Sequence, residues 1–313
     1  MDSTITAQIA ITRAKRRISP AVIRENVNGY LFLAPWLIGF FGLFLGPALA
    51  SLYFSFTQYD VLSPSKWIGV GNYVKMFTAD NLFYTSLART LYFTGLSVPL
   101  GVFGSMVLAI LLNMKLKGTV IYRTLFFMPS LVPLVSAVVL WLWLLNPDWG
   151  IVNNALRYIG IKPPAWFADR NWALPSLVMV GLWGSIGGTR MIIFLAGLQG
   201  IPEELYDAAA IDGANTWNRI RHVTIPLLSP TIFFNLVLAI IGALQAFQGA
   251  FVATEGGPAY ATWFFGLHIY KHAFDYWNMG YASALAWFFA VVIIGLTILQ
   301  QRLSTKWVFY YGA

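Results

Sequence analysis

Residues 202–215 read Pro-Glu-Glu-Leu-Tyr-Asp-Ala-Ala-Ala-Ile-Asp-Gly-Ala-Asn, and a further proline, Pro226, follows eleven residues later. This polar stretch lies between two long apolar runs, at residues 173–199 and 230–254. It is the longest segment in the second half of the chain that could form a water-exposed surface. The residues around this segment are apolar, as in a membrane protein. A compact polar loop in such a protein indicates a surface that another protein contacts.

The composition of the chain indicates a polytopic membrane protein. Of its 313 residues, 58% are hydrophobic and only 10% are charged, and the mean hydropathy is +0.67. A soluble domain typically carries about 25% charged residues. The 13 Trp and 15 Tyr residues are suited to the membrane interface. The chain has no cysteine, which excludes disulfides, thiol catalysis and cysteine-bound metals.

Six apolar stretches are long enough to cross a bilayer, because a spanning helix needs about 20 mostly apolar residues. They are residues 30–56, 86–113, 121–145, 173–199, 230–254 and 281–301. The sequence therefore predicts an all-α polytopic membrane protein with six transmembrane helices in one domain, residues 30–301. An N-terminal segment, 1–29, precedes this domain, and a tail, 302–313, follows it. The polar loop at 200–229 connects the fourth and fifth helices.

The distribution of Lys and Arg predicts that both termini face the cytoplasm. Cytoplasmic loops of membrane proteins carry an excess of these residues. More of them fall on the side of the N-terminus than on the opposite side, including a cluster between Arg13 and Arg24. This asymmetry accounts for most of the net charge of +8, so no nucleic-acid partner is needed. Since the first 29 residues contain no apolar h-region, we expect no signal peptide.

The first half of the polar loop has the composition of a capped helix. Pro202 suits the start of a helix, and Glu203, Glu204 and Asp207 place negative charge near its N-terminus, where the helix dipole favours it. Three alanines follow and give a face of small residues that a partner could approach closely. A docking surface is one interpretation of this helix, and a connecting loop without a partner is the other.

The second half of the loop predicts a tight turn and a further helical turn. Asp212 and Gly213 would end the first helix, with Gly213 in the left-handed conformation that glycine adopts readily. A second amphipathic turn is expected from residue 215 to about residue 223, and Pro226 is expected to stop it before the next span.

The string Asp-Ala-Ala-Ala-Ile-Asp-Gly-Ala at 207–214, with Ile-Pro-Leu at 225–227, resembles the EAA loop of permease subunits of bacterial ATP-binding-cassette importers. The flanking segments, Phe-Leu-Ala-Gly-Leu-Gln-Gly-Ile-Pro at 194–202 and Thr-Glu-Gly-Gly-Pro at 254–258, resemble the carbohydrate-uptake branch of that family. The resemblance extends roughly from Leu31 to the C-terminus.

This resemblance implies a non-catalytic, multi-pass transport subunit in the bacterial inner membrane, surrounded by lipid. Its partners would be a second homologous permease, two ATPase subunits that bind ATP and Mg²⁺, a periplasmic substrate-binding protein and an oligosaccharide. The chain has no Gly-x-x-x-x-Gly-Lys-Ser/Thr motif, so no nucleotide cofactor is expected in it.

The resemblance also implies that the polar loop carries a coupling helix seated in a groove of the ATPase. The residues expected at this contact are Glu204, Asp207, Ala208, Ala209, Asp212, Gly213 and Pro226. The family motif opens with Glu, whereas this chain has Asp207, which shortens the reach of the carboxylate by one methylene. Glu204, one turn earlier, is the alternative partner for the ATPase.

Polar side chains within the predicted spans indicate the transport path, because an unpaired polar group in lipid is costly. Arg190 lies inside the fourth span, and Gly242, Gln245 and Gly249 fall close to one helical face of the fifth. In the sugar permeases that the chain resembles, these stretches line the transport site. The expected path residues are Thr189, Arg190, Gly242, Gln245 and Gln248. The alternatives are helix–helix hydrogen bonds for the glutamines and a contact with the partner permease for Arg190.

If Arg190 faces the path, its guanidinium would bind a carboxylate through two hydrogen bonds. We therefore hypothesise an acidic, uronate-containing oligosaccharide as the cargo, with a neutral sugar or a glycerol-phosphate-type cargo as the alternative. An ion-coupled secondary transporter is disfavoured, because the six predicted spans contain no Asp or Glu.

A membrane-embedded enzyme is also disfavoured, because the sequence contains no nucleophile–base or metal-binding constellation. The three histidines, His222, His268 and His272, are few and scattered. His268 and His272 are four residues apart, and we interpret them as interfacial histidines without a metal.

Overall fold

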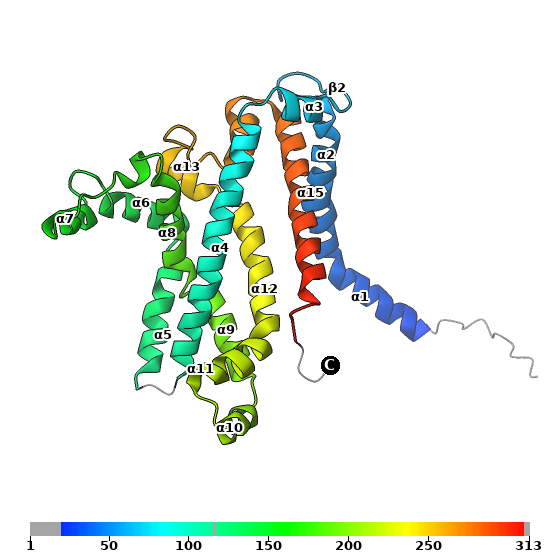
Figure 1. The fold of residues 1–313 in the computed structure, drawn as a ribbon. Coiled ribbons are helices and arrows are strands. Elements are labelled where there is room, and N and C mark those ends of the chain that lie inside the picture. The colour runs from blue at the N-terminus through cyan, green and yellow to red at the C-terminus, as the bar shows by residue number, and fades with distance from the viewer. Residues whose placement is uncertain (1–19, 115–116, 310–313) are drawn as a thin grey trace, which may run out of the picture. The chain divides into compact units, whose positions relative to one another are not determined.

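The computed structural model describes residues 20–114 and 117–309, which are mainly helical (Figure 1). These residues divide into two units, one ending at Tyr53 and one beginning at Phe54. Of the predicted N-terminal segment, the part before Pro20 lies outside the described residues, as does the end of the C-terminal tail after residue 309.

The first unit contains one long apolar helix. It consists of α1 (Pro20–Gly39), a π-helical segment η1 (Phe40–Leu45) and most of α2 (Gly46–Ser55). Residues Arg24–Ser55 are a candidate membrane span of 32 residues, which begins six residues before the predicted first span.

In the second unit, three uninterrupted helices are long and apolar enough to cross a membrane. They are α4 (Phe83–Asn113), the helix Thr216–Leu244 and α15 (Met279–Ser304). The shorter elements that connect or flank them are β1 (Thr57–Gln58), β2 (Lys66–Trp67), α3 (Gly71–Thr78), α7 (Ile151–Tyr158), η3 (Trp166–Ala168), α10 (Glu203–Ile211), α13 (Gln248–Thr254), α14 (Phe265–Tyr270) and η5 (Lys271–Asp275). The two strands pair antiparallel, with Thr57 opposite Trp67.

The third and fourth predicted spans are each broken into two helices. In the third, α5 (Thr119–Phe127) and η2 (Met128–Leu131) meet α6 (Leu134–Leu144) at 96°. Proline explains this break, because Pro133 cannot donate a helical hydrogen bond and immediately precedes α6. The predicted polytopic fold is thus confirmed as four continuous candidate spans in the described chain, or six if each bent pair counts as one.

In the fourth predicted span, α8 (Ala173–Ser185) and α9 (Thr189–Gln199) meet at 48°. The break contains Gly187 and Gly188. A Cβ atom on Gly187 would overlap the carbonyl oxygen of Phe126, so glycine allows α5 to approach the break closely.

The fifth predicted span is wrong at both ends. The helix starts at Thr216, where α11 (Thr216–Arg219) continues through a π-helical turn, η4 (Ile220–Thr224), into α12 (Ile225–Leu244). Pro226 therefore does not stop the preceding turn. The π-helical turn shifts the hydrogen-bond register directly before Pro226, and such a shift accommodates the missing N–H group. The helix ends at Leu244, ten residues before the predicted end.

Apolar packing holds the second unit together in three places. Phe194 and Leu228 are fully buried where α4, α9 and α12 meet. Val138 is buried where α6, α8 and α13 pack together. Phe83 and Phe265 are buried where α4 and α14 pack against α15. These contacts position the walls of the cavity described next.

Candidate functional site

A cavity of about 520 Å³ lies among α4, α8, α12 and the segment that leads into α13. Arg190, Gly242, Gln245 and Gln248, all predicted path residues, contribute to its wall. A smaller cavity of about 270 Å³ is lined by the fifth predicted residue, Thr189, and again by Arg190. The two cavities share Ser185, Arg190 and Leu238. The structure therefore brings all five predicted path residues to one pair of adjoining cavities.

Arg190 lies where the two cavities adjoin. It is the second residue of α9, directly after the break in the fourth span. Its side chain reaches α4, because a Cβ atom on Gly101 would lie only 2.6 Å from Nη1 of Arg190. Within residues 20–114 and 117–309, the guanidinium has no carboxylate partner. An arginine at membrane depth without an ion pair can bind an anionic group that enters the cavity.

Gln245 and Gln248 reach the cavity in a different way from the one that the sequence predicted. Gln245 caps the end of α12, and Gln248 begins α13. The chain turns between these two helices, so Gly249 does not share a helical face with Gly242. The turn itself carries both glutamines to the cavity wall, and the shared helical face that the sequence predicted does not form.

Sequence reasoning missed the aromatic part of the cavity wall. Phe93, Phe247 and Phe264 line the larger cavity. The rings of Phe93 and Phe264 lie 5.0 Å apart, from centroid to centroid. The hydroxyl of Ser97, one turn after Phe93, is buried there without a hydrogen-bond partner. The chain has 24 Phe residues, so composition alone could not single out these three.

The polar loop forms the predicted helix and turn. Helix α10 carries the exposed carboxylates of Glu204 and Asp207, and Ala208 beside them is exposed. Gly213 has φ +77°, the predicted left-handed conformation, and nothing lies within 4 Å of a Cβ built there. The hydroxyl groups of Tyr206 and Thr224 lie 3.1 Å apart and join α10 to the helix that follows.

Two apolar side chains on this loop were not predicted. Ile211 is 87% exposed at the end of α10, and Trp217 is 65% exposed in α11. A large exposed apolar side chain can anchor a contact with another protein. No sequence signal singles them out, because the loop also contains Leu205, Ile220, Val223 and other large apolar residues.

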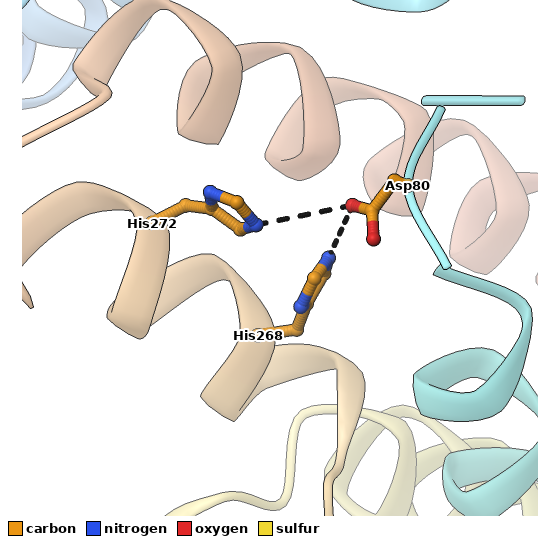
Figure 2. A group of neighbouring side chains, drawn as sticks. All are labelled: Asp80, His268 and His272. Carbon is orange, nitrogen blue, oxygen red and sulfur yellow. Dashed lines mark hydrogen bonds and ion pairs between the residues drawn. The ribbon is translucent and has the colours of Figure 1, made fainter. Parts of the chain in front are cut away.

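The structure brings His268 and His272 together with Asp80 (Figure 2). Nε2 of His268 lies 2.8 Å from Oδ2 of Asp80, and Nε2 of His272 lies 3.8 Å from the same oxygen. Burial by itself would raise the pKa of the Asp80 carboxyl, but hydrogen bonds from Tyr281 and His268 hold that pKa below its usual value. Burial also lowers the pKa of His268, against the opposing effect of Asp80. This cluster therefore contains an ionised carboxylate and two neutral imidazoles near neutral pH.

The sequence and fold of the chain match known proteins over most of its length. Residues 76–308 match the family described as "Binding-protein-dependent transport system inner membrane component". The chain is 38% identical to the probable ABC transporter permease protein YesP of Bacillus subtilis, over 93% of this chain and 95% of that protein. It is 35% identical to the lactose transport system permease protein LacF of Rhizobium radiobacter, over 88% and 93%.

A solved structure has a similar fold. It is the crystal structure of a bacterial alginate ABC transporter in complex with an alginate pentasaccharide-bound periplasmic protein. One of its chains superposes with a TM-score of 0.82 at 24% sequence identity, over 91% of this chain and 96% of that chain.

Proposed function

Because the chain belongs to the family of inner-membrane components of binding-protein-dependent transport systems, we propose that it is the permease subunit of an ATP-driven oligosaccharide importer and that its cargo carries acidic groups such as uronates. A periplasmic binding protein delivers the cargo, and the permease passes it to the cytoplasm by alternating access. A second, homologous permease completes the path. Two ATPase subunits bind ATP and Mg²⁺, so this chain needs no cofactor and catalyses no reaction.

One observation supports the acidic cargo: Arg190 faces both cavities and has no carboxylate partner among the described residues. A guanidinium presents a planar fork of donors that fits a carboxylate through two hydrogen bonds. Gln245 and Gln248 add neutral donors and acceptors along the same wall, as hydroxyl groups of a sugar require. Phe93 and Phe264 supply flat apolar surfaces. This mixture of groups fits a sugar that bears a negative charge.

A neutral sugar is the second candidate cargo, and the relationship to a lactose permease favours it. In that case Arg190 would contact the partner permease, through an ion pair or a hydrogen bond to a backbone carbonyl. A glycerol-phosphate-type cargo would use the same guanidinium as an acidic sugar does.

The polar loop would transmit the work of the ATPase. With both termini in the cytoplasm, α10 faces the cytoplasm and its exposed acids, Glu204 and Asp207, meet a groove of the ATPase. Ile211 and Trp217 would add the apolar anchors that protein contacts need. Closure of the ATPase pair on ATP would draw the coupling helices together and open the path to the outside, and hydrolysis would reverse the movement.

The proposal is tested by assembling the chain with its partner subunits and measuring ATP hydrolysis with a ligand-loaded binding protein. We expect a uronate oligosaccharide to stimulate hydrolysis. Replacing Arg190 with Gln should reduce the transport of that cargo about 10- to 100-fold, the effect of losing a hydrogen bond to a charged group. Arg190→Lys keeps the positive charge but loses the planar pair of donors. Its transport of the uronate cargo should therefore lie between that of the natural protein and that of Arg190→Gln. Arg170→Gln, in an exposed loop, is the matched control.

Two results would contradict the acidic cargo. The first is transport of a labelled neutral maltodextrin without transport of a uronate oligomer. The second is unchanged uptake by the Arg190→Gln protein. If no ligand-loaded binding protein stimulated ATP hydrolysis, the importer function itself would be wrong.

A further inference from the structure

A network of hydrogen bonds centred on Asp80 joins three segments that are far apart in the sequence. Oδ2 of Asp80 accepts hydrogen bonds from Nε2 of His268, at 2.8 Å, and from the hydroxyl of Tyr281, at 2.5 Å. Oδ1 accepts hydrogen bonds from the backbone N–H groups of Leu82 and Phe83, at 2.9 and 3.1 Å, at the start of α4. Asp80 thereby ties the N-terminus of α4 to α14 and α15.

The proton on His268 is fixed by its other neighbour. The indole Nε1–H of Trp263 can only donate, and it lies 3.1 Å from Nδ1 of His268. Nδ1 is therefore the acceptor, and Nε2 carries the proton that Asp80 accepts. A nitrogen that binds a metal must have a free lone pair, so Nε2 of His268 could ligate an ion only by giving up its proton and its hydrogen bond to Asp80. In the cluster of Figure 2, a hydrogen bond therefore joins His268 to Asp80, whereas Nδ1 of His272 is buried without a hydrogen-bond partner among the described residues.

A separate hydrogen bond joins α14 to α4 beside the cavity wall. The backbone N–H of Phe265, at the start of α14, donates to the hydroxyl of Thr90 in α4, at 2.8 Å. Phe264, the residue before it, places its ring against Phe93. Among the α4 residues that line the cavity, Phe93 is the one nearest the start of that helix. The Phe93–Phe264 pair therefore lies at the end of the cavity towards the N-terminus of α4.

We propose that Asp80 is a positioning residue for transport, which holds α14 against α4 through His268 and so keeps Phe264 against Phe93 at the outer end of the cavity. This inference rests on the proposed function, in which the N-terminus of α4 faces the outside. Without the carboxylate, His268 and Tyr281 lose their shared acceptor, and α14 is then held only by the Phe265–Thr90 hydrogen bond and by the packing of the Phe265 ring against Phe83 and Phe289. Phe264 is then free to withdraw from Phe93 and open the cavity.

The natural chain has no cysteine, so a single reporter can be introduced into it, and the transporter without the reporter gives the background labelling of the partner subunits. We would place Ser97→Cys, on the cavity wall, in the complete transporter in proteoliposomes without nucleotide. The reporter would be labelled from the outside with a membrane-impermeant sulfonated maleimide. Asp80→Asn should raise the labelling rate about tenfold, since it removes a charged acceptor of several hydrogen bonds. Asp60→Asn is the matched control, because the side-chain hydrogen bonds of Asp60 go only to Ser63 nearby.

Two further variants keep the test decisive if Asp80→Asn fails to assemble. Tyr281→Phe removes one donor and keeps the ring, so it should give a smaller increase in labelling. Asp80→Glu restores the carboxylate and should return the rate towards that of the parent protein. Equal labelling of the Asp80→Asn, Tyr281→Phe and Asp60→Asn proteins would overturn the proposal.

Zinc provides an independent check. The natural transporter is tested for binding of one Zn²⁺, and so are the His268→Gln and His272→Gln proteins. Zinc binding that both substitutions abolish would contradict the proton assignment and overturn the proposal. The labelling assay needs no cargo. A failure of the proposed function would instead appear as the absence of cargo-stimulated ATP hydrolysis with normal labelling, so the two failures are distinguishable.

Discussion

At the scale of single residues, the sequence located charged and polar side chains better than it located their partners. Arg190 was predictable, because a lone arginine within an apolar span has few structural uses. Asp80 was not, because its partners His268 and Tyr281 are 188 and 201 residues away. No local pattern brings such residues together; only the packing of α14 and α15 does so.

His272 makes the stability of the protein depend on pH. Burial and the neighbouring His268 lower the pKa of His272 from 6.5 to about 4, partly offset by Asp80. Lys75 of α3 also lowers this pKa, and the rings of Tyr276 and Tyr281 complete the surroundings of His272. The unfolded chain therefore binds a proton at this position between pH 6.5 and about 4, whereas the folded protein does not.

We expect the free energy of unfolding to fall as the pH drops through this window, and His272→Gln to remove part of that fall. The measurement is the melting temperature of the purified protein at pH 7 and at pH 4.5. His222→Gln, at an exposed position, is the control and should retain the full pH dependence of the parent protein. An equal loss of stability in the His272→Gln and natural proteins would refute the role of His272.

At the scale of elements, helix existence was predictable and helix continuity was not. All six apolar stretches form helices, because length and hydropathy decide this in lipid. The breaks depend on proline and glycine positions and on neighbouring helices. Pro133 precedes a 96° bend, whereas Pro226 lies within a continuous helix. A π-helical turn directly before Pro226 lets the helix continue through this proline, whereas Pro133 lies at a bend. The sequence does not predict the π-helical turn.

The polar loop at 200–229 is the element whose proposed contacts can be tested most directly. Ile211→Ser and Trp217→Ala should each weaken retention of the ATPase subunits by about 2 kcal/mol, the effect of removing a buried anchor from an interface. Co-purification of the ATPase subunits and cargo-stimulated ATP hydrolysis are the measurements. Ile159→Ser, at another exposed isoleucine, is the control. Retention equal to that of the control would show that neither side chain anchors the ATPase.

At the scale of the whole molecule, the topology follows from the distribution of charge. The positive-inside rule predicts that the loop with Trp217 faces the cytoplasm and that α7 faces the outside. Trp217 and Tyr158 are 65% and 94% exposed, so both positions are accessible to reagents. The two cavities form where α4, α6, α8, α9, α12 and α13 meet, and this meeting could not be predicted from one sequence.

Single cysteines test this orientation. Tyr158→Cys should react with an impermeant maleimide in intact cells, whereas Trp217→Cys should react only after the membrane is permeabilised. Reaction of both cysteines in intact cells, or the reverse pattern, would show that the predicted orientation is wrong. The unsubstituted chain, which has no cysteine, is the control for background labelling.

The helix Thr216–Leu244 has a mechanical consequence. Its 29 residues give a rod of about 43 Å, at 1.5 Å per residue. One end leaves the loop that α10 forms, and the other ends directly at Gln245 on the cavity wall. In the proposed mechanism, a tilt of this helix would move both ends at once, so its length would set how far Gln245 moves when α10 moves. The π-helical turn at Ile220–Thr224 lies near the end next to α10, where a small change in winding would give the largest displacement at Gln245.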